Sequence, residues 1–165
     1  MLNRKTLIAL SLSGFIAACG GGGETPEVPT AEPAGESMKD IGDYVVHFSA
    51  QSTDALTPEV ARAYNIVRSK NRAMLTVSVL RESDNGSVPA DVSVKTVNLT
   101  GQLKNVAMRE IEEQDAVYYV GETPVAHRET LIFDITVTPE GAASQSEVRF
   151  KLEFYTDFYD LILFS

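Results

Sequence analysis

The sequence predicts an all-β domain: an antiparallel β-sandwich of about seven strands, of immunoglobulin-like or fibronectin-like architecture. From Gly42 onward, apolar side chains recur at every second residue rather than at every third or fourth. Turn-forming residues interrupt these runs at intervals of about ten residues. Long helical segments do not alternate with the strands, which argues against a parallel α/β fold. A β-barrel is the alternative that the same pattern allows.

Four runs show the two-residue period most clearly, and each predicts a strand with one buried and one solvent-facing side. In the last of them the apolar residues alternate with Arg149, Lys151, Glu153 and Tyr155. A further run, at 114–120 (QDAVYYV), resembles the tyrosine-corner stretch of immunoglobulin domains. The apolar positions of the four runs are Tyr44, Val46, Phe48 and Ala50; Leu75, Val77 and Val79; Leu131, Phe133, Ile135 and Val137; and Val148, Phe150, Leu152 and Phe154.

The sequence contains one short helical candidate, near residues 57–64. Thr57 is a typical N-cap, Pro58 suits the first helical position, and Glu59 places a negative charge in the first turn. Turns between strands are predicted at Asn85-Gly86, at Gly101, just before Ala116 and at Gly141.

Residues 1–19 show a pattern of charged, apolar and small residues that indicates export. Arg4 and Lys5 precede an apolar stretch, residues 7–18, that is too short to span a bilayer. Residues 16–19 (IAAC) resemble the lipoprotein cleavage box. That resemblance implies a signal peptide over residues 1–18 and an acylated N-terminal Cys19. The alternative is an ordinary signal peptide in which the cysteine is incidental.

Residues 19–37 are rich in Gly, Pro and Glu, and we expect them to form a disordered tether ahead of a single β-sandwich domain, 38–165. The resemblance to lipoproteins implies, from Gly20 in place of an aspartate, the periplasmic face of the outer membrane. Without Arg4 and Lys5 the 14 Lys and Arg become 12 against 23 Asp and Glu, a formal charge of −11. Nucleic acid is therefore not expected as a partner.

Several motifs follow one another from residue 38 onward: GDYVVHFSA, AYNI, RSKNRAMLTVSV, NLTGQL, DAVYYVGETPV and FYTD. Their order and spacing resemble the bacterial family known as domain of unknown function 4426, and the resemblance covers residues 38–157. It implies a small, mostly β, secreted or envelope protein. It supplies no assigned activity and no catalytic residues.

The sequence lacks the patterns expected of an enzyme. A G-x-S-x-G nucleophile motif is missing, and the glycine run at 20–23 lies in the tether rather than at a strand-to-helix junction. We therefore expect no catalytic residues and no cofactor. The two histidines, His47 and His127, lack zinc-binding spacings and are expected at the surface, so no metal ligand is assigned. The alternative is a copper site that combines them with Met38, Met74 and Met108.

A basic stretch, RSKNR at 68–72, stands out in this acidic chain. On an extended segment Arg68, Lys70 and Arg72 would point the same way and offer three positive charges to an anionic partner. The alternative is that they pair with the acidic residues near Glu110 or protect an edge strand. The apolar tail at 158–165 (FYDLILFS) either packs back on the domain or forms a contact surface.

These observations lead to one expected function and one alternative. We expect a non-enzymatic interaction or accessory module of the periplasm, held at the membrane by a lipid on Cys19, with an envelope protein as partner. The alternative is a periplasmic protein that binds a small ligand or a metal, copper or zinc.

Overall fold

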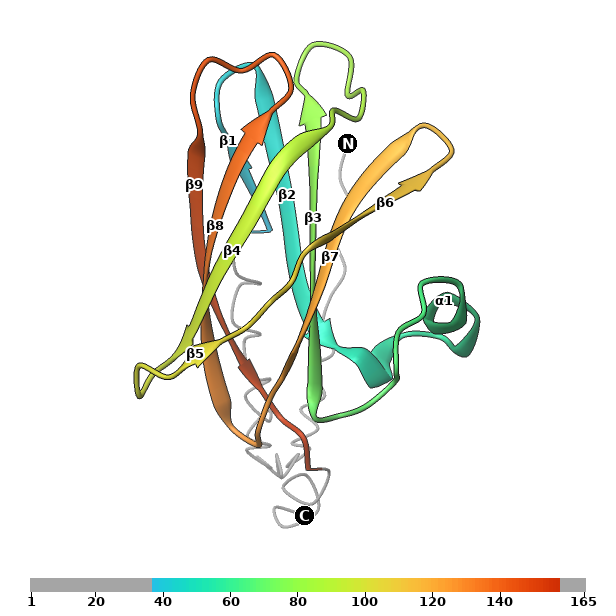
Figure 1. The fold of residues 1–165 in the computed structure, drawn as a ribbon, viewed down its shortest axis with the longest axis vertical. Helices are drawn as coiled ribbons and strands as arrows, with labels where there is room; N and C mark the ends of the chain where they lie inside the picture. The colour runs from blue at the N-terminus through green and yellow to red at the C-terminus, as the bar shows by residue number, and fades with distance from the viewer. Residues whose placement is uncertain (1–36, 158–165) are drawn as a thin grey trace, which may run out of the picture. The chain divides into compact units, whose positions relative to one another are not determined.

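The computed structural model describes residues 37–157. The expected signal peptide, Cys19, most of the tether and the apolar tail lie outside the described residues. Within them the chain forms nine strands, one α-helix and one 3-10 turn (Figure 1). Their bounds are β1 (Met38–Asp40), β2 (Tyr44–Ser52), η1 (Thr53–Ala55), α1 (Pro58–Ala63), β3 (Arg72–Arg81), β4 (Ala90–Asn98), β5 (Leu103–Lys104), β6 (Arg109–Glu113), β7 (Ala116–Pro124), β8 (Glu129–Pro139) and β9 (Ser146–Phe154).

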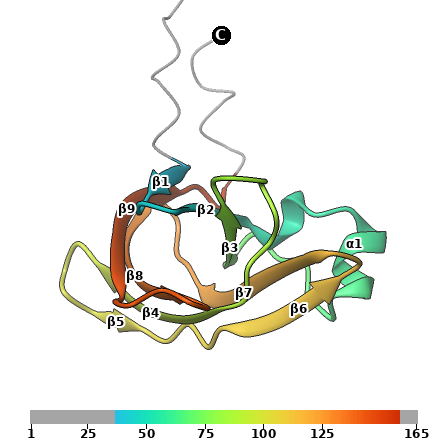
Figure 2. The ribbon, with the colours of Figure 1, turned by 90° about the horizontal axis from the view of Figure 1, so that it is seen from above.

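The strands form two antiparallel sheets, in the orders β1-β2-β3-β7-β6 and β5-β4-β8-β9. The described strands of one sheet do not pair with those of the other, so the fold is a sandwich and not a closed barrel. Figure 2 shows the sheets facing each other, with β9 beside β1 and β2. The expected all-β sandwich is confirmed. The structure has more strands than about seven because β1 and β5 contain three and two residues, too few to show a period.

The inner faces of the two sheets form one apolar core, as the two-residue period predicts. Phe133 is fully buried, and its ring stacks on that of Phe150 at 4.8 Å. The ring centroid of Phe48, from β2, lies 4.8 Å from that of Phe150, and this contact joins the sheets where β2 faces β9. Leu152 is the exception among the predicted inner positions, since 36% of it is exposed at the edge of β9.

The predicted helix and turns are confirmed. The Thr57 hydroxyl accepts the N–H of Val60 at 3.3 Å, and Pro58 occupies the first helical position of α1. The helix packs on the outer side of the five-stranded sheet over a second apolar cluster that includes Met74 and Val120. The turns carry left-handed residues, among them Asn85, Gln114, Gly101 and Gly141. Residues 37–157 contain no helix with the length and apolar character needed to cross a membrane.

Tyr119 of β7 links the two sheets. Its hydroxyl accepts the N–H of Ala90, the first residue of β4, at 2.7 Å. The same hydroxyl donates to Glu110 of β6 at 2.9 Å. The run QDAVYYV therefore provides a tyrosine that ties one sheet to the backbone of the other, although here the hydroxyl accepts from an N–H.

A mostly buried ion pair holds the opposite end of the four-stranded sheet. Lys104 of β5 lies 2.8 Å from Glu129 of β8, and their side chains are only 14% and 10% exposed. Glu129 also accepts from the Asn98 side chain at 2.9 Å and from the N–H of Ala126 at 2.8 Å. Burial alone would raise the pKa of Glu129, but these hydrogen bonds and the charge of Lys104 outweigh it and hold the pKa below its ordinary value.

The connection between β5 and β6 crosses close to Gly121 of β7. A Cβ at this position would lie 2.6 Å from Sδ of Met108, 2.6 Å from a methyl of Val106 and 3.2 Å from the carbonyl oxygen of Ala107. Val106 is a buried member of the main core. Glycine is thus required here by a close approach and not by its backbone conformation.

Candidate functional site

The basic stretch at 68–72 does not form an extended segment. Lys70 lies in a turn, and strand β3 begins only at Arg72. The buried hydroxyl of Thr53 causes this local structure: it lies 2.9 Å from the carbonyl oxygen of Val67 and 3.0 Å from that of Ser69. It also accepts the N–H of Ser69 at 2.9 Å. The loop is therefore folded around one threonine.

Two of the three cations in this stretch contact different neighbours. The Arg68 guanidinium donates to the carbonyl oxygen of Asp54 at 2.8 Å. Arg72 pairs with Glu122 of β7 at 3.3 Å, and not with the acidic strand β6. The three cations do not form the straight row that an extended segment would give. Docking of a partner at Arg68, Lys70 and Arg72 stays a prediction.

The two histidines lie on different elements. His47, in β2, faces away from the core and pairs in register with Met38 of β1. His127 lies in the loop between β7 and β8, where its Nδ1 accepts the N–H groups of Thr156 and Asp157 at 3.2 and 3.3 Å. Among residues 37–157, no three His, Cys, Asp or Glu side chains are grouped so that they could hold a metal ion.

The methionines of the alternative copper site are also separated. Met74 packs beneath α1, and Met108 packs against the main core. Met38 is 57% exposed and is the one of the three that is register-paired with a histidine, His47.

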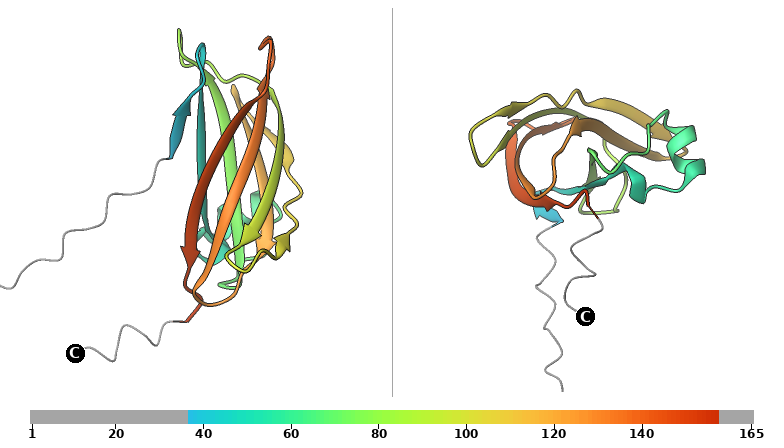
Figure 3. Two further views of the ribbon diagram at one scale, coloured as in Figure 1. Left: turned by 90° about the vertical axis from the view of Figure 1, so that its left-hand side faces the viewer. Right: turned by 90° about the horizontal axis from the view of Figure 1, so that it is seen from below.

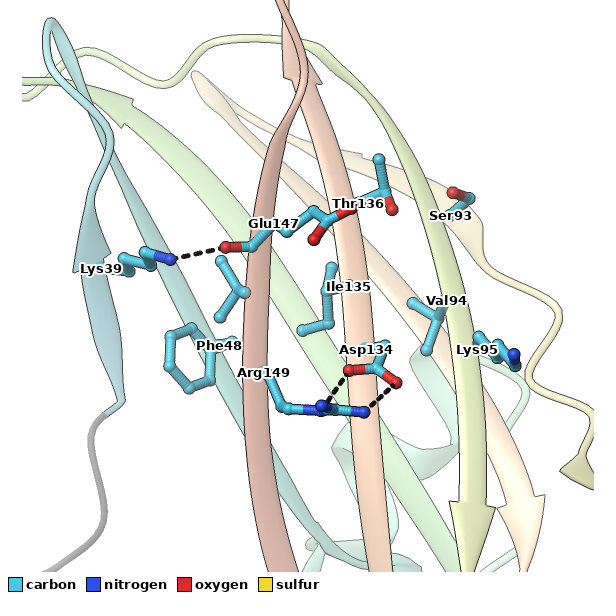
Figure 4. Close-up of a pocket in the computed structure, with 11 residues that line it drawn as sticks. Lys39, Phe48, Ser93, Val94, Lys95, Asp134, Ile135, Thr136, Glu147 and Arg149 are labelled. Atoms are coloured by element: carbon cyan, nitrogen blue, oxygen red, sulfur yellow. Dashed lines mark hydrogen bonds and ion pairs between the residues drawn. The ribbon is translucent and has the colours of Figure 1, made fainter. Parts of the chain in front are cut away.

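A groove with a volume of about 780 Å³ crosses the outer side of the four-stranded sheet (Figure 4). We call it the outer-sheet groove. Residues two apart on a strand share a face, so the pairing of β4, β8 and β9 aligns their outward side chains in rows about 7 Å apart. Two polar rows form the groove: Ser93, Thr136 and Glu147, and Lys95, Asp134 and Arg149.

One ion pair in the groove has a two-point geometry. Arg149 Nε lies 2.6 Å from Asp134 Oδ1, and a terminal guanidinium nitrogen lies 3.1 Å from Oδ2. Arg149 is 70% exposed, so the pair contributes at most about 1 kcal/mol to folding stability. Its main effect is to neutralise Asp134 and to fix the orientation of the guanidinium group in the groove.

Cations lie at both ends of the groove. Lys39 of β1 reaches across the gap between the sheets, and its Nζ donates to the carbonyl oxygen of Glu147 at 2.6 Å. At the other end the side chain of Lys95, from β4, forms no hydrogen bond or ion pair within the part of the chain that the structure describes. With Asp134 neutralised by Arg149, Lys39 and Lys95 face a single remaining carboxylate, that of Glu147. The groove is thus suited to a ligand with anionic and hydrogen-bonding groups.

Sequence reasoning did not identify the residues of this groove. The alternation in β9 placed Arg149 on a solvent-facing side, but such charges are typical of any wetted strand. Lys39 precedes the first clear period, and nothing in its surroundings indicates that it reaches β9. The two polar rows form because β4, β8 and β9 align in the sheet. The residue pattern within one strand does not indicate this alignment.

Comparisons with known proteins identify relatives of this fold. The sequence profile of a family described as "Domain of unknown function (DUF4426)" matches residues 38–157. A crystal structure of a DUF4426 family protein from Pseudomonas aeruginosa PAO1 is similar, with 31% identity, 74% of this chain and 97% of that chain covered, and a TM-score of 0.64. No curated protein matches this chain.

More distant similarity is found to FetP of uropathogenic Escherichia coli strain F11. A copper-bound FetP variant has 11% identity and a TM-score of 0.52, with 73% of this chain and 95% of that chain covered. FetP recombinantly expressed in the periplasm has 13% identity and a TM-score of 0.51, with 75% and 95% covered. At these identities the likeness shows a shared fold.

Proposed function

Because this chain belongs to the DUF4426 family, whose function is unknown, we propose a role from its own surface: a non-enzymatic module of the bacterial cell envelope that binds a partner through the outer-sheet groove. The observation that carries this proposal is the groove itself, with two aligned polar rows and a lysine at each end. Its carboxylate at Asp134 is held by Arg149, and its lining contains no histidine or cysteine, so it offers binding groups rather than a nucleophile and base.

The location in the envelope is part of the proposal. The pattern of residues 1–19 supports export and acylation at Cys19, and the composition of residues 19–37 supports a tether long enough to let the domain move away from the membrane. The periplasmic face of the outer membrane is the proposed site.

The chemistry of the groove indicates the class of partner. Lys95 and Lys39 favour anionic groups, and the hydroxyls of Ser93 and Thr136 offer hydrogen bonds to a polar chain. The lining is open to water, so such contacts are individually weak and sensitive to salt. We propose a reversible contact with an acidic segment of another envelope protein.

Photocrosslinking in cells tests the groove directly. A crosslinking residue at Ser93 is expected to capture a specific envelope protein, and Lys95→Glu is expected to reduce the yield about ten-fold because it reverses the end charge of the groove. Arg62→Glu is the matched control: it reverses one exposed charge on α1, on the other sheet. Capture should persist in that variant.

The predicted basic stretch is the competing surface in the same experiment. If the triple change Arg68→Glu, Lys70→Glu and Arg72→Glu abolishes capture while Lys95→Glu leaves it intact, docking occurs at the basic stretch and the groove proposal is wrong. The groove proposal is also rejected if the chain with the crosslinking residue at Ser93 and no other change gives no specific product.

Copper binding is a second candidate function, favoured by the register pair of Met38 and His47 on the exposed side of β1 and β2. Thioether and imidazole are both ligands that Cu(I) accepts. If this candidate holds, Cu(I) should shift the NMR signals of the His47 ring and the Met38 methyl, and Met38→Leu should remove the shift of His47. An unchanged His47 spectrum, or an equal response at His127, would reject this site.

A further inference from the structure

Among residues 37–157, β9 is an edge strand and pairs with β8 alone. In an antiparallel strand, alternate residues turn both their N–H and C=O groups to the same side. Lys39 of β1 donates a hydrogen bond to the carbonyl oxygen of Glu147. The carbonyl group of Glu147 therefore points away from β8. Arg149, Lys151 and Glu153 follow at steps of two, so their backbone groups face the same free edge.

Beyond Glu147, the described residues leave this free edge without hydrogen-bond partners. Within residues 37–157 the backbone N–H and C=O groups of Arg149, Lys151 and Glu153 form no hydrogen bonds outside the sheet ladder. Leu152, which points to the inner side, keeps 36% of its surface exposed. The edge therefore offers both backbone groups and apolar surface that an additional strand would cover.

Lys39 occupies part of the place that an additional strand would take. Strand β1 lies beyond β2 in the other sheet, on the side where β2 meets β9 (Figures 2 and 3). From there the Lys39 ammonium gives the Glu147 carbonyl oxygen the hydrogen bond that the N–H of a neighbouring strand would give. Charged side chains placed at strand edges in this way oppose uncontrolled pairing.

The outward charges of β9 read negative, positive, positive, negative along the strand, at Glu147, Arg149, Lys151 and Glu153. The order of charges is therefore the same in both directions along the strand. If a second copy paired antiparallel and fully overlapped with β9, Glu147 would face a second Glu153, and Arg149 would face a second Lys151. Like charges directly opposite each other destabilise a strand pair. The edge therefore disfavours its own copy.

We propose that the free edge of β9 accepts an extended strand of a partner protein that carries acidic side chains opposite Arg149 and Lys151 and apolar side chains at the alternate positions, against Leu152. The acidic side chains complete two cross-strand ion pairs, one of which extends the contact between Arg149 and Asp134. The strand displaces Lys39 from Glu147 as it pairs. This contact uses the backbone of β9 and goes beyond the proposed role of the outer-sheet groove.

Two blocked heptapeptides serve as probes with the full chain: Thr-Val-Glu-Val-Glu-Val-Thr and its counterpart with lysine in place of glutamate. The glutamate peptide is expected to slow amide hydrogen exchange at Arg149 and Lys151 about ten-fold at millimolar concentration, because strand addition gives these amides a partner. The lysine peptide should leave exchange unchanged.

Two variants sharpen the test. Lys39→Met removes the competing hydrogen bond at Glu147 and is expected to strengthen glutamate-peptide binding several-fold. The double change Lys151→Glu and Glu153→Lys keeps the net charge but makes the charges alternate along β9. In an antiparallel pair of two such strands, each positive side chain would then face a negative one. It should reduce glutamate-peptide binding and produce a dimer by sedimentation analysis.

The proposal is overturned if neither peptide protects Arg149 and Lys151, or if both protect them equally. It is also overturned if the unmodified chain already dimerises through β9, since the second copy would then be the natural occupant. Lys95→Glu separates this contact from the groove: it reverses a charge on β4 and is expected to leave peptide protection of β9 unchanged.

Discussion

Replacing Lys104 with methionine is expected to lower the free energy of unfolding by about 3 kcal/mol at pH 7, because it leaves the carboxylate of Glu129 charged and mostly buried without its cation. The hydrogen bonds from Asn98 and Ala126 remain, but they are neutral donors and only partly offset the lost charge. Chemical denaturation at pH 7 measures this loss.

The pH dependence of the same variant gives an independent check. The folded-state pKa of Glu129 lies below its ordinary value, so its network stabilises the native chain above the pKa of the unfolded state, and this stabilisation is lost as the pH falls through the folded pKa. Without Lys104 that folded pKa rises. The difference in stability between the two proteins should therefore narrow as the pH is lowered from 7 to about 4.

Lys104→Arg keeps the positive charge and is the matched control for Lys104→Met. It is expected to retain most of the stability, with a smaller loss from altered geometry. A methionine variant that is as stable as the unmodified protein at pH 7 would show that the ion pair is dispensable. A constant difference across the acidic range would show that packing, and not charge, causes the loss.

Gly121→Ala is expected to cost about 2 kcal/mol, because the added methyl group would lie 2.6 Å from both Met108 and Val106. The long Met108 side chain can turn aside, whereas Val106 is held in the core, so the connection between β5 and β6 must move outward. Thermal unfolding should show a clear drop in Tm.

A double-mutant cycle distinguishes this clash from a general intolerance of the site. Val106→Ala alone leaves a cavity, but combined with Gly121→Ala it makes room for the new methyl group. The double variant should therefore lose less free energy of unfolding than the two single variants lose together. If the loss in the double variant equals the sum of the two single losses, a clash between the new methyl group and Val106 does not explain the effect of Gly121→Ala. Gly42→Ala is a useful contrast, because that glycine has open space around it but a left-handed φ of 91°.

The class of the fold could be predicted from the sequence because the evidence for it is local. The alternation of Val148, Phe150 and their neighbours, and the cap at Thr57, depend only on residues close in the chain. The same reasoning did not predict the conformation of the basic stretch at 68–72. Its conformation is decided by the hydroxyl of Thr53, about fifteen residues earlier, and no repeating pattern signals that contact.

The candidate sites were beyond sequence reasoning for a related reason. Lys95 and Arg149 are separated by more than fifty residues and share a row only through the register of β8 between them. The contact of Lys39 depends on a strand of three residues lying against the other sheet. In both cases the contact depends on how the strands align. The sequence around a solvent-facing lysine or arginine does not distinguish it from the same residue in any other exposed strand.

The position of β1 gives the domain a mechanical asymmetry. Any pull on the chain ahead of Ser37 acts first on β1, which is held to β2 by only three residue pairs and by one bond from Phe48 N–H to the Ser37 carbonyl oxygen. With so few backbone pairs, β1 separates from its sheet more easily than the longer strands do. Tension would then withdraw Lys39 from Glu147 and uncover the edge of β9 while the core stays folded.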